Sequence, residues 1–284
     1  MRREWEPEEL VASWTLVERD ERELISYKHD GGRLAFSLTL KFFELEGRFP
    51  RHAGELPPAA VSYVARQVGV DPAELCGYDW SGRSAERHRS QIRRLFGFRR
   101  FSEDDEVKLA GWLADEVAAV ELADERLREA LLARCWAERI EPPARVNRIL
   151  GMARAAVAER FTATTASRLP PPTVLRLEGL AGLTGAGADP ASGVWLAELK
   201  ADPGRVSRDT MTGELAKLAR VRGLELPAGL FDGWSEQLVA AWRARAATEY
   251  ASDLRAHPQP VRLTLLAALC WVRQGELVDG SWTC

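Results

Sequence analysis

Apolar residues recur every three or four positions through most of this 284-residue chain, which is the period of an amphipathic helix. One such segment begins with acidic residues at 103–106, where they would face the positive end of a helix. The apolar positions that follow them are Val107, Ala110, Leu113 and Val117. The pattern predicts a helix that starts near Ser102 and directs these four side chains inward.

Three further apolar stripes predict helices in the same way. The first consists of Leu127, Leu131 and Cys135. The second starts at Pro143, a residue favoured in the first turn of a helix, and carries Val146, Ile149, Leu150, Ala153, Val157 and Phe161. The third follows Pro260 and consists of Val261, Leu265, Leu266, Leu269 and Val272. Because this last segment is apolar over most of its circumference, we expect it to be buried.

The segment from Leu34 to Leu45 fits two periods. Alternate positions are apolar, as in a strand, and Leu34, Leu38, Phe42 and Leu45 also lie on one helical face. No neighbouring segment has the pattern of a strand that could pair with it, so we expect a helix. The fold class predicted from the whole pattern is all-α.

Prolines and glycines predict how the chain divides. Pro170, Pro171 and Pro172 are unsuited to a helix interior, and residues 182–193 are rich in Gly, Ala, Asp and Pro. We therefore expect a helical domain at 1–168, a linker at 169–193 and a second helical unit at 194–284. In that unit Ser235 is placed to cap a helix at 236–248, and we expect the unit to be truncated at its end.

Charge is distributed in blocks, although the formal net charge is only -3. Residues 31–100 hold 12 basic and 7 acidic side chains, residues 101–141 hold 5 and 12, and residues 142–177 hold 6 and 1. Such blocks create local potentials that the net charge conceals. Any binding of a polyanion would therefore depend on the two basic blocks.

Residues 57–95 predict a helix-turn-helix-like core of three helices. Pro57 and Pro58 open the first helix, and Gly69 ends it. Asp71 and Glu74 form a capping-box pattern with proline between them, which starts a second helix. The third is expected from Ser81 to Leu95, and it is rich in arginine.

The third predicted helix and its extension carry the strongest candidate binding signal. Between residues 83 and 100 there are seven arginines and one acidic residue. A helix fits the major groove of duplex DNA, and guanidinium groups bind phosphate oxygens or guanine edges. The expected groove-facing set is Arg83, Arg87, His88, Arg89, Arg93 and Arg94. The expected phosphate contacts are Lys41, Arg66, Arg99 and Arg100, with a second surface formed by Arg145, Arg148 and Arg154.

Other interpretations of these residues stay open at this point. The arginines could pair with the acidic helix at 103–116, or bind RNA or another polyanion. A cysteine nucleophile at Cys76 with His88 is conceivable, although a buried structural cysteine is the better interpretation. The four cysteines are far apart, so we expect no metal site, no cofactor and a reducing, cytoplasmic location. No run of apolar residues is long enough to span a membrane.

Several sequence segments resemble the N-terminal region of the large transposases of Tn-three-family replicative transposons. They include Arg33–Lys41, Leu45–Pro50, Pro57–Val61, Val68–Pro72 and Tyr78–Arg83. Later segments with the same similarity are Leu199–Gly204, Ala240–Ala246, Leu254–Pro258 and Cys270–Arg273. The similarity extends from about residue 8 to residue 280, with the motifs in the family's order.

The resemblance implies a function and also a missing part. It implies an all-helical region that recognises the terminal inverted repeats of a transposon as double-stranded DNA. It also implies a ribonuclease-H-like catalytic domain with three magnesium-binding carboxylates, which we expect to be absent from this chain. We therefore expect DNA binding without chemistry. The alternative is a non-catalytic interaction protein, or a remnant, that competes or pairs with full-length transposase or with itself.

Overall fold

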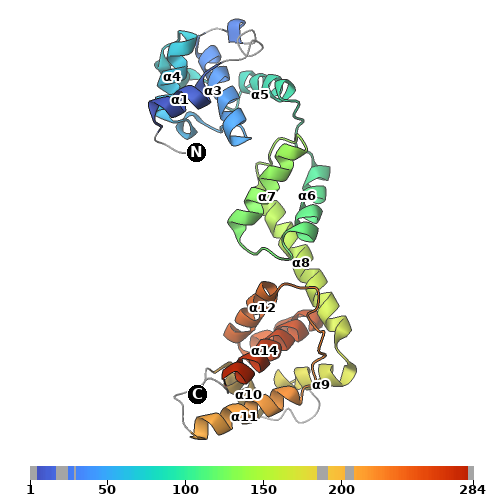
Figure 1. Ribbon diagram of the computed structural model, residues 1–284. Coiled ribbons are helices and arrows are strands. Elements are labelled where there is room, and N and C mark those ends of the chain that lie inside the picture. Colours follow the sequence, from blue (N-terminus) through green and yellow to red (C-terminus); the bar gives the residue numbers. More distant parts are fainter. Residues whose placement is uncertain (1–4, 17–24, 29, 184–190, 202–207, 281–284) are drawn as a thin grey trace. The chain divides into compact units, whose positions relative to one another are not determined.

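The described part of the chain is helical throughout. The computed structural model describes residues 5–16, 25–28, 30–183, 191–201 and 208–280 (Figure 1). Within these ranges there is no β-strand, and one isolated bridge joins Arg99 to Ile140. The predicted all-α class is confirmed. None of the described helices is long and apolar enough to cross a membrane.

The chain divides into two compact units, each formed by two segments of the sequence. Unit 1 comprises Met1–Lys108 and Arg128–Val146, and unit 2 comprises Leu109–Leu127 and Asn147–Cys284. The segment expected to be a linker contains helix α9 (Pro171–Leu180), which buries Thr173, Leu177 and Leu180. A helix can begin there because prolines in its first turn lack only N–H groups that would have no helical partner.

Unit 1 is built around α3 (Asp30–Glu46), against which α1 (Pro7–Trp14), α4 (Pro58–Val68) and α5 (Arg83–Leu95) pack (Figure 1). Nearly every side chain of α3 from Leu34 to Phe43 is buried. The strand-like alternation of this segment therefore comes from a helix that is covered on all sides. Ser37 and Thr39 are also buried in this helix. Their hydroxyl groups are satisfied because each donates a hydrogen bond to the carbonyl oxygen four residues earlier.

The predicted three-helix core is present in part. Helix α4 ends at Gly69, whose φ of 65° is left-handed, and α5 follows as expected. Between them the chain forms the short 3-10 helix η2 (Pro72–Gly77), which Asp71 caps by accepting a hydrogen bond from the Ala73 N–H at 2.8 Å. Both η2 and α5 pack on α3. The long central helix, and not the η2 turn, organises this core.

Two helices follow α5, and one of them buries a face that only partly matches the predicted stripe. They are α6 (Glu103–Glu116) and α7 (Asp124–Ala137). In α6, Val107 is 65% exposed, while Leu109, Ala110 and Leu113 are buried. The inward position predicted for Val107 is wrong, because the buried face of α6 is turned towards Leu109.

Unit 2 contains α8 (Val146–Arg168) almost entirely, α9, α10 (Ala191–Lys200), α11 (Arg208–Arg222), α12 (Glu236–Thr248), α13 (Ala251–Ala256) and α14 (Gln259–Gly280). Helix α14 is central: α9, α11, α12 and α13 contact it. The predicted inward stripe of α8 from Ile149 to Phe161 is buried, and so is the central run of α14 from Leu263 to Cys270, whereas Val261 and Val272 are half-buried. Ser235 caps α12 by accepting a hydrogen bond from the Leu238 N–H, as predicted.

Candidate nucleic-acid interface

Helix α5 begins at a tight turn formed by Asp79-Trp-Ser-Gly82. The Asp79 carboxylate accepts hydrogen bonds from the backbone N–H and the hydroxyl of Ser81, at 2.9 and 2.8 Å. The Gly82 N–H donates to the Asp79 carbonyl oxygen, and Gly82 is the N-cap residue. Because Gly82 has no side chain to cap the helix, the first N–H groups of α5 have no side-chain acceptor.

The two sides of α5 differ in what they face. Ala85, His88 and Ile92 are buried, so this side packs into unit 1. At about 100° per residue, Arg83, Arg87 and Arg94 lie within about 40° of one another on the opposite side. All three are exposed, and no described residue forms a hydrogen bond or ion pair with them. We call these three arginines the α5 stripe.

Two other arginines of α5 are engaged inside unit 1. Arg93 is 6% exposed and pairs with Glu86 at 2.9 Å and with Glu141 at 2.8 Å. Arg89 is half-buried and donates hydrogen bonds to the carbonyl oxygens of Pro50 and Trp80. These guanidinium groups hold loops and helices of unit 1 together, so they contribute little to its exposed charge.

The arginines after α5 also have intramolecular partners. Arg99 binds Asp105 at the start of α6 through two hydrogen bonds of 2.6 Å. Arg100 pairs with Glu86 at 3.0 Å. The alternative interpretation that the arginines pair with the acidic helix at 103–116 therefore applies to Arg99. Both side chains are more than half exposed, so their outer surfaces still contribute positive potential.

The remaining candidates of unit 1 lie in different settings. Lys41 is buried and its ammonium pairs with Glu44 at 2.5 Å. Arg66 is exposed on α4, over the ring of Tyr63. Arg145 is exposed just before α8. The exposed positions agree with a surface role, and the burial of Lys41 indicates a structural one.

In α8 the predicted basic surface is partly used for packing. Arg154 pairs with Asp124 and donates a 3.0 Å hydrogen bond to the Leu122 carbonyl oxygen. Arg148 is exposed and has an intramolecular contact of its own. Six residues after Arg154, Arg160 pairs with Asp115. Arginines of α8 thus bind the loop and helix beside them.

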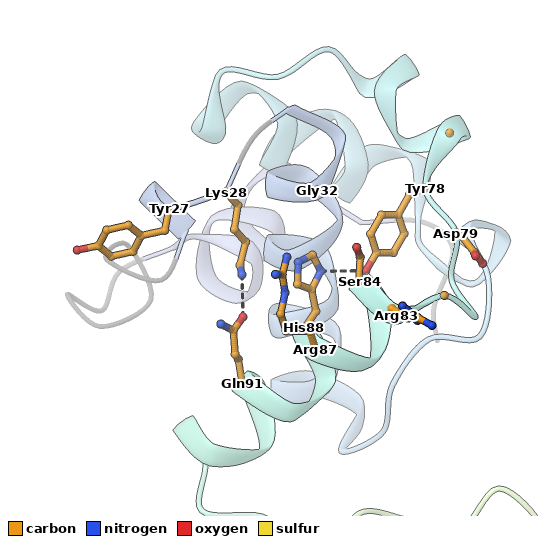
Figure 2. A pocket seen from close by; sticks show the side chains of 12 residues that line it. Tyr27, Lys28, Gly32, Tyr78, Asp79, Arg83, Ser84, Arg87, His88 and Gln91 are labelled. Carbon is orange, nitrogen blue, oxygen red and sulfur yellow. Dashed lines mark hydrogen bonds between the residues drawn. The ribbon is translucent and has the colours of Figure 1, made fainter.

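An open pocket of about 700 Å³, which we call the α5 pocket, lies beside the first half of α5 (Figure 2). Its lining includes Lys28, Tyr78, Arg83, Ser84, Arg87 and His88. The Tyr78 hydroxyl and His88 Nδ1 form a 2.8 Å hydrogen bond, and the two rings stack. Burial, together with the nearby charges of Lys28 and Arg87, lowers the pKa of His88 to about 4. His88 is therefore neutral near pH 7.

The three described cysteines lie in different surroundings. Cys76 is exposed and not buried as expected, because Leu75 occupies the inward position of η2. Cys135 and Cys270 are buried, and burial raises the pKa of each thiol, to about 11 and about 12. Cys284 lies outside the described residues. Within the described ranges, no three His, Cys, Asp or Glu side chains are grouped to hold a metal ion.

Comparison with known proteins places this site in a family. Residues 1–149 match the family model described as "Domain of unknown function (DUF4158)". The chain belongs to this family. The DUF4158 region includes the α5 stripe, the α5 pocket and the whole of α3, which positions them.

A more distant similarity extends beyond the DUF4158 region. The "Transposase for transposon Tn1546" of Enterococcus faecium is 24% identical over 216 residues, which are 75% of this chain and 22% of that protein. The chain thus spans about a fifth of the length of this relative. The DUF4158 protein is therefore distantly related to a transposase, in agreement with the resemblance of its sequence.

One basic residue in the lining of the α5 pocket was not among the predicted contacts. Lys28 is 8% exposed, and its ammonium donates a 2.7 Å hydrogen bond to the side-chain oxygen of Gln91. It lies 4.2 Å from the centre of the Phe36 ring. No local pattern could have identified Lys28, because it reaches α5 only through the tertiary fold.

His88 makes the stability of the DUF4158 region depend on pH. Its folded-state pKa of about 4 is below the ordinary value of 6.5, so its contribution is complete above pH 6.5 and is lost as the pH falls towards 4. We expect the free energy of unfolding to fall by about 1–2 kcal/mol more between pH 7 and pH 5 than in His88→Gln. Urea unfolding at both pH values measures this difference.

The pH range from 7 to 5 separates the effect of His88 from that of Asp105. Asp105 has a lowered pKa, chiefly because of its hydrogen bond from Arg99, so its contribution is lost only when the pH falls below about 4. If the wild type and the His88→Gln variant show the same pH dependence between pH 7 and pH 5, folding does not lower the pKa of His88.

Proposed function

We propose that this chain binds duplex DNA at the terminal inverted repeats of a transposon, as the N-terminal part of a transposase. Unit 1 makes the contact through the α5 stripe. The chain itself contributes recognition of the DNA ends and no chemical step. The observation that carries the proposal is a row of exposed arginines without intramolecular partners among the described residues, on the outer side of a helix whose inner side is buried.

The geometry of the stripe supports DNA as the partner. From Arg83 to Arg94 the helix rises about 16 Å, and a helix of this length fits along or across the major groove. Guanidinium groups with free N–H donors can form bidentate hydrogen bonds with phosphate oxygens or guanine edges. The stripe therefore suits both the positioning and the reading of a duplex.

The transposase relationship supports the choice of DNA sequence. A transposase has to find the ends of the element that it moves, and the resemblance concerns the region that recognises these ends. The DUF4158 match covers the same part of the chain as the stripe. Together they favour the inverted repeats over duplex DNA of any sequence.

Binding to an inverted-repeat duplex and to a scrambled duplex of the same length tests the proposal. We expect the repeat to bind at least tenfold more tightly. Log affinity should fall with log salt at a slope of about 0.9 per neutralised phosphate. Fluorescence anisotropy from 50 to 200 mM salt measures both quantities.

Equal affinity for the two duplexes would contradict end recognition. Absence of binding to either duplex at 50 mM salt would contradict DNA binding altogether. The wild-type chain should be tested in full, because the DUF4158 region ends within α8.

A further inference from the structure

The α5 pocket has three basic side chains and several hydrogen-bond donors in its lining. Lys28, Arg83 and Arg87 line it, together with the Ser84 hydroxyl (Figure 2). The acidic residue among the described lining residues is Asp79, and its carboxylate accepts two hydrogen bonds from Ser81. The lining thus has two more positive charges than negative ones.

Lys28 is the least expected member of this lining. Its side chain is more than nine-tenths buried. It has Gln91 and the ring of Phe36 as partners, and no described carboxylate lies within ion-pair distance. Burial and the nearby Arg87 both lower its pKa.

A buried ammonium group without a carboxylate partner costs folding free energy. The positive charge of Arg87 beside it adds to that cost. A protein that keeps such a group at the wall of an open pocket favours an anionic ligand there, because the ligand would supply the missing negative charge.

We propose that the α5 pocket holds one phosphate group of the bound DNA backbone, gripped by Lys28 and Arg87 together. This inference rests on the proposed function and adds the place and the groups of one contact. Arg83, the Ser84 hydroxyl and the uncapped first N–H groups of α5 complete the set of donors.

The phosphodiester group of the DNA backbone suits the chemistry of this lining. It has only acceptor oxygens to offer, and the pocket wall offers several donors. The volume of about 700 Å³ is much larger than a phosphate group and leaves room for the sugars on either side. In the tautomer with its hydrogen on Nε2, the neutral His88 would donate there as well, and its Nδ1 would accept from the Tyr78 hydroxyl.

Two variants with a matched control test the inference. In Lys28→Met and in Arg87→Gln we expect affinity for the inverted-repeat duplex to fall about tenfold. Because both residues hold the same phosphate, the double variant should be far less than a hundredfold weaker. In the control, Arg94 lies on the stripe outside the pocket, so Lys28→Met with Arg94→Gln should be about a hundredfold weaker.

Thermal unfolding of the same variants separates a binding role from a structural one. Lys28→Met removes a buried charge and keeps the length of the side chain, so we expect its Tm to equal or exceed that of the wild type. Loss of DNA affinity with retained or increased Tm supports the inference. A lower Tm, with affinity reduced only in proportion to the unfolded fraction, would overturn it.

Inorganic phosphate identifies the source of the phosphate group. We expect phosphate to raise the Tm of the wild type above that in chloride of equal ionic strength, and to leave Lys28→Met unchanged. If the wild type binds duplex DNA but Lys28→Met binds it equally well, the pocket inference fails and the proposed function stands. If the wild type is stabilised by phosphate but binds no duplex, the proposed function fails and the site takes free phosphate.

Discussion

Replacing Arg83, Arg87 and Arg94 together by glutamine is expected to weaken the binding of duplex DNA by roughly a hundredfold to a thousandfold. Each arginine contributes a charge-assisted contact, and three such contacts at somewhat over 1 kcal/mol each give this range. The fold should be unaffected, because all three side chains are exposed and have no partner among the described residues. Fluorescence anisotropy at 100 mM salt measures the loss, and circular dichroism verifies the fold.

The control variant removes the same number of charges from unit 2. Arg176, Arg222 and Arg245 are at least partly exposed on α9, α11 and α12. Replacing them by glutamine should change DNA affinity by less than about tenfold, since only the general electrostatic attraction is reduced. Equal losses in the two triple variants would show that net charge, and not the α5 stripe, determines binding.

Arg93→Ala is expected to destabilise the protein by about 2–3 kcal/mol and to leave the affinity of the folded protein for DNA unchanged. The guanidinium is buried and pairs with Glu86 and Glu141, so its removal takes a partner from both carboxylates, and Glu86 alone keeps a second one in Arg100. We place the cost below that of a fully buried pair, because both carboxylates are partly exposed. Urea unfolding measures the loss of stability.

Arg94→Ala is the natural comparison, because Arg94 is the next residue along the helix and is exposed. We expect this substitution to leave the free energy of unfolding within about 0.5 kcal/mol of the wild type and to weaken DNA binding. We therefore expect Arg93→Ala to lower only the stability and Arg94→Ala to lower only the DNA affinity. A stable Arg93→Ala variant that has lost DNA affinity would show that Arg93 contacts the DNA.

Much of the helical structure of both units could be predicted from the period of apolar residues. Helix α8 buries the residues from Ile149 to Phe161 that the pattern assigned to its inner face. Local capping signals also held, as at Gly69 and Ser235. These features depend on residues that are close in sequence, so they can be predicted from one amino-acid sequence.

The arrangement of arginines on α5 was only partly predictable. Counting charge between residues 83 and 100 treats all seven arginines alike, whereas their burial differs with their angle around the helix. Ala85 and Ile92 define the inner side, and the arginines farthest from it are those of the stripe. A helical projection would have separated Arg87 from Arg93, but the partners of Arg93 come from the tertiary fold.

The organisation of the units could not be predicted from local patterns. The central place of α3 depends on which helices cover it, and the pattern shows only that it is apolar on several sides. The α5 pocket joins Lys28 to a helix more than 50 residues later in the chain. Likewise, the prolines at 170–172 predict that α8 ends before them. They do not predict that α9 begins at Pro171, because α9 is stabilised by the packing of its buried side chains.

The salt dependence of DNA binding by the wild type and by the triple variant of the α5 stripe tests the central claim most directly. Each stripe arginine that neutralises a separate phosphate adds about 0.9 to the slope of log affinity against log salt. The account predicts that the slope falls by about 2 to 3 when Arg83, Arg87 and Arg94 are replaced together. Parallel lines for the two proteins would contradict it, because the stripe would then make no contact with the DNA backbone.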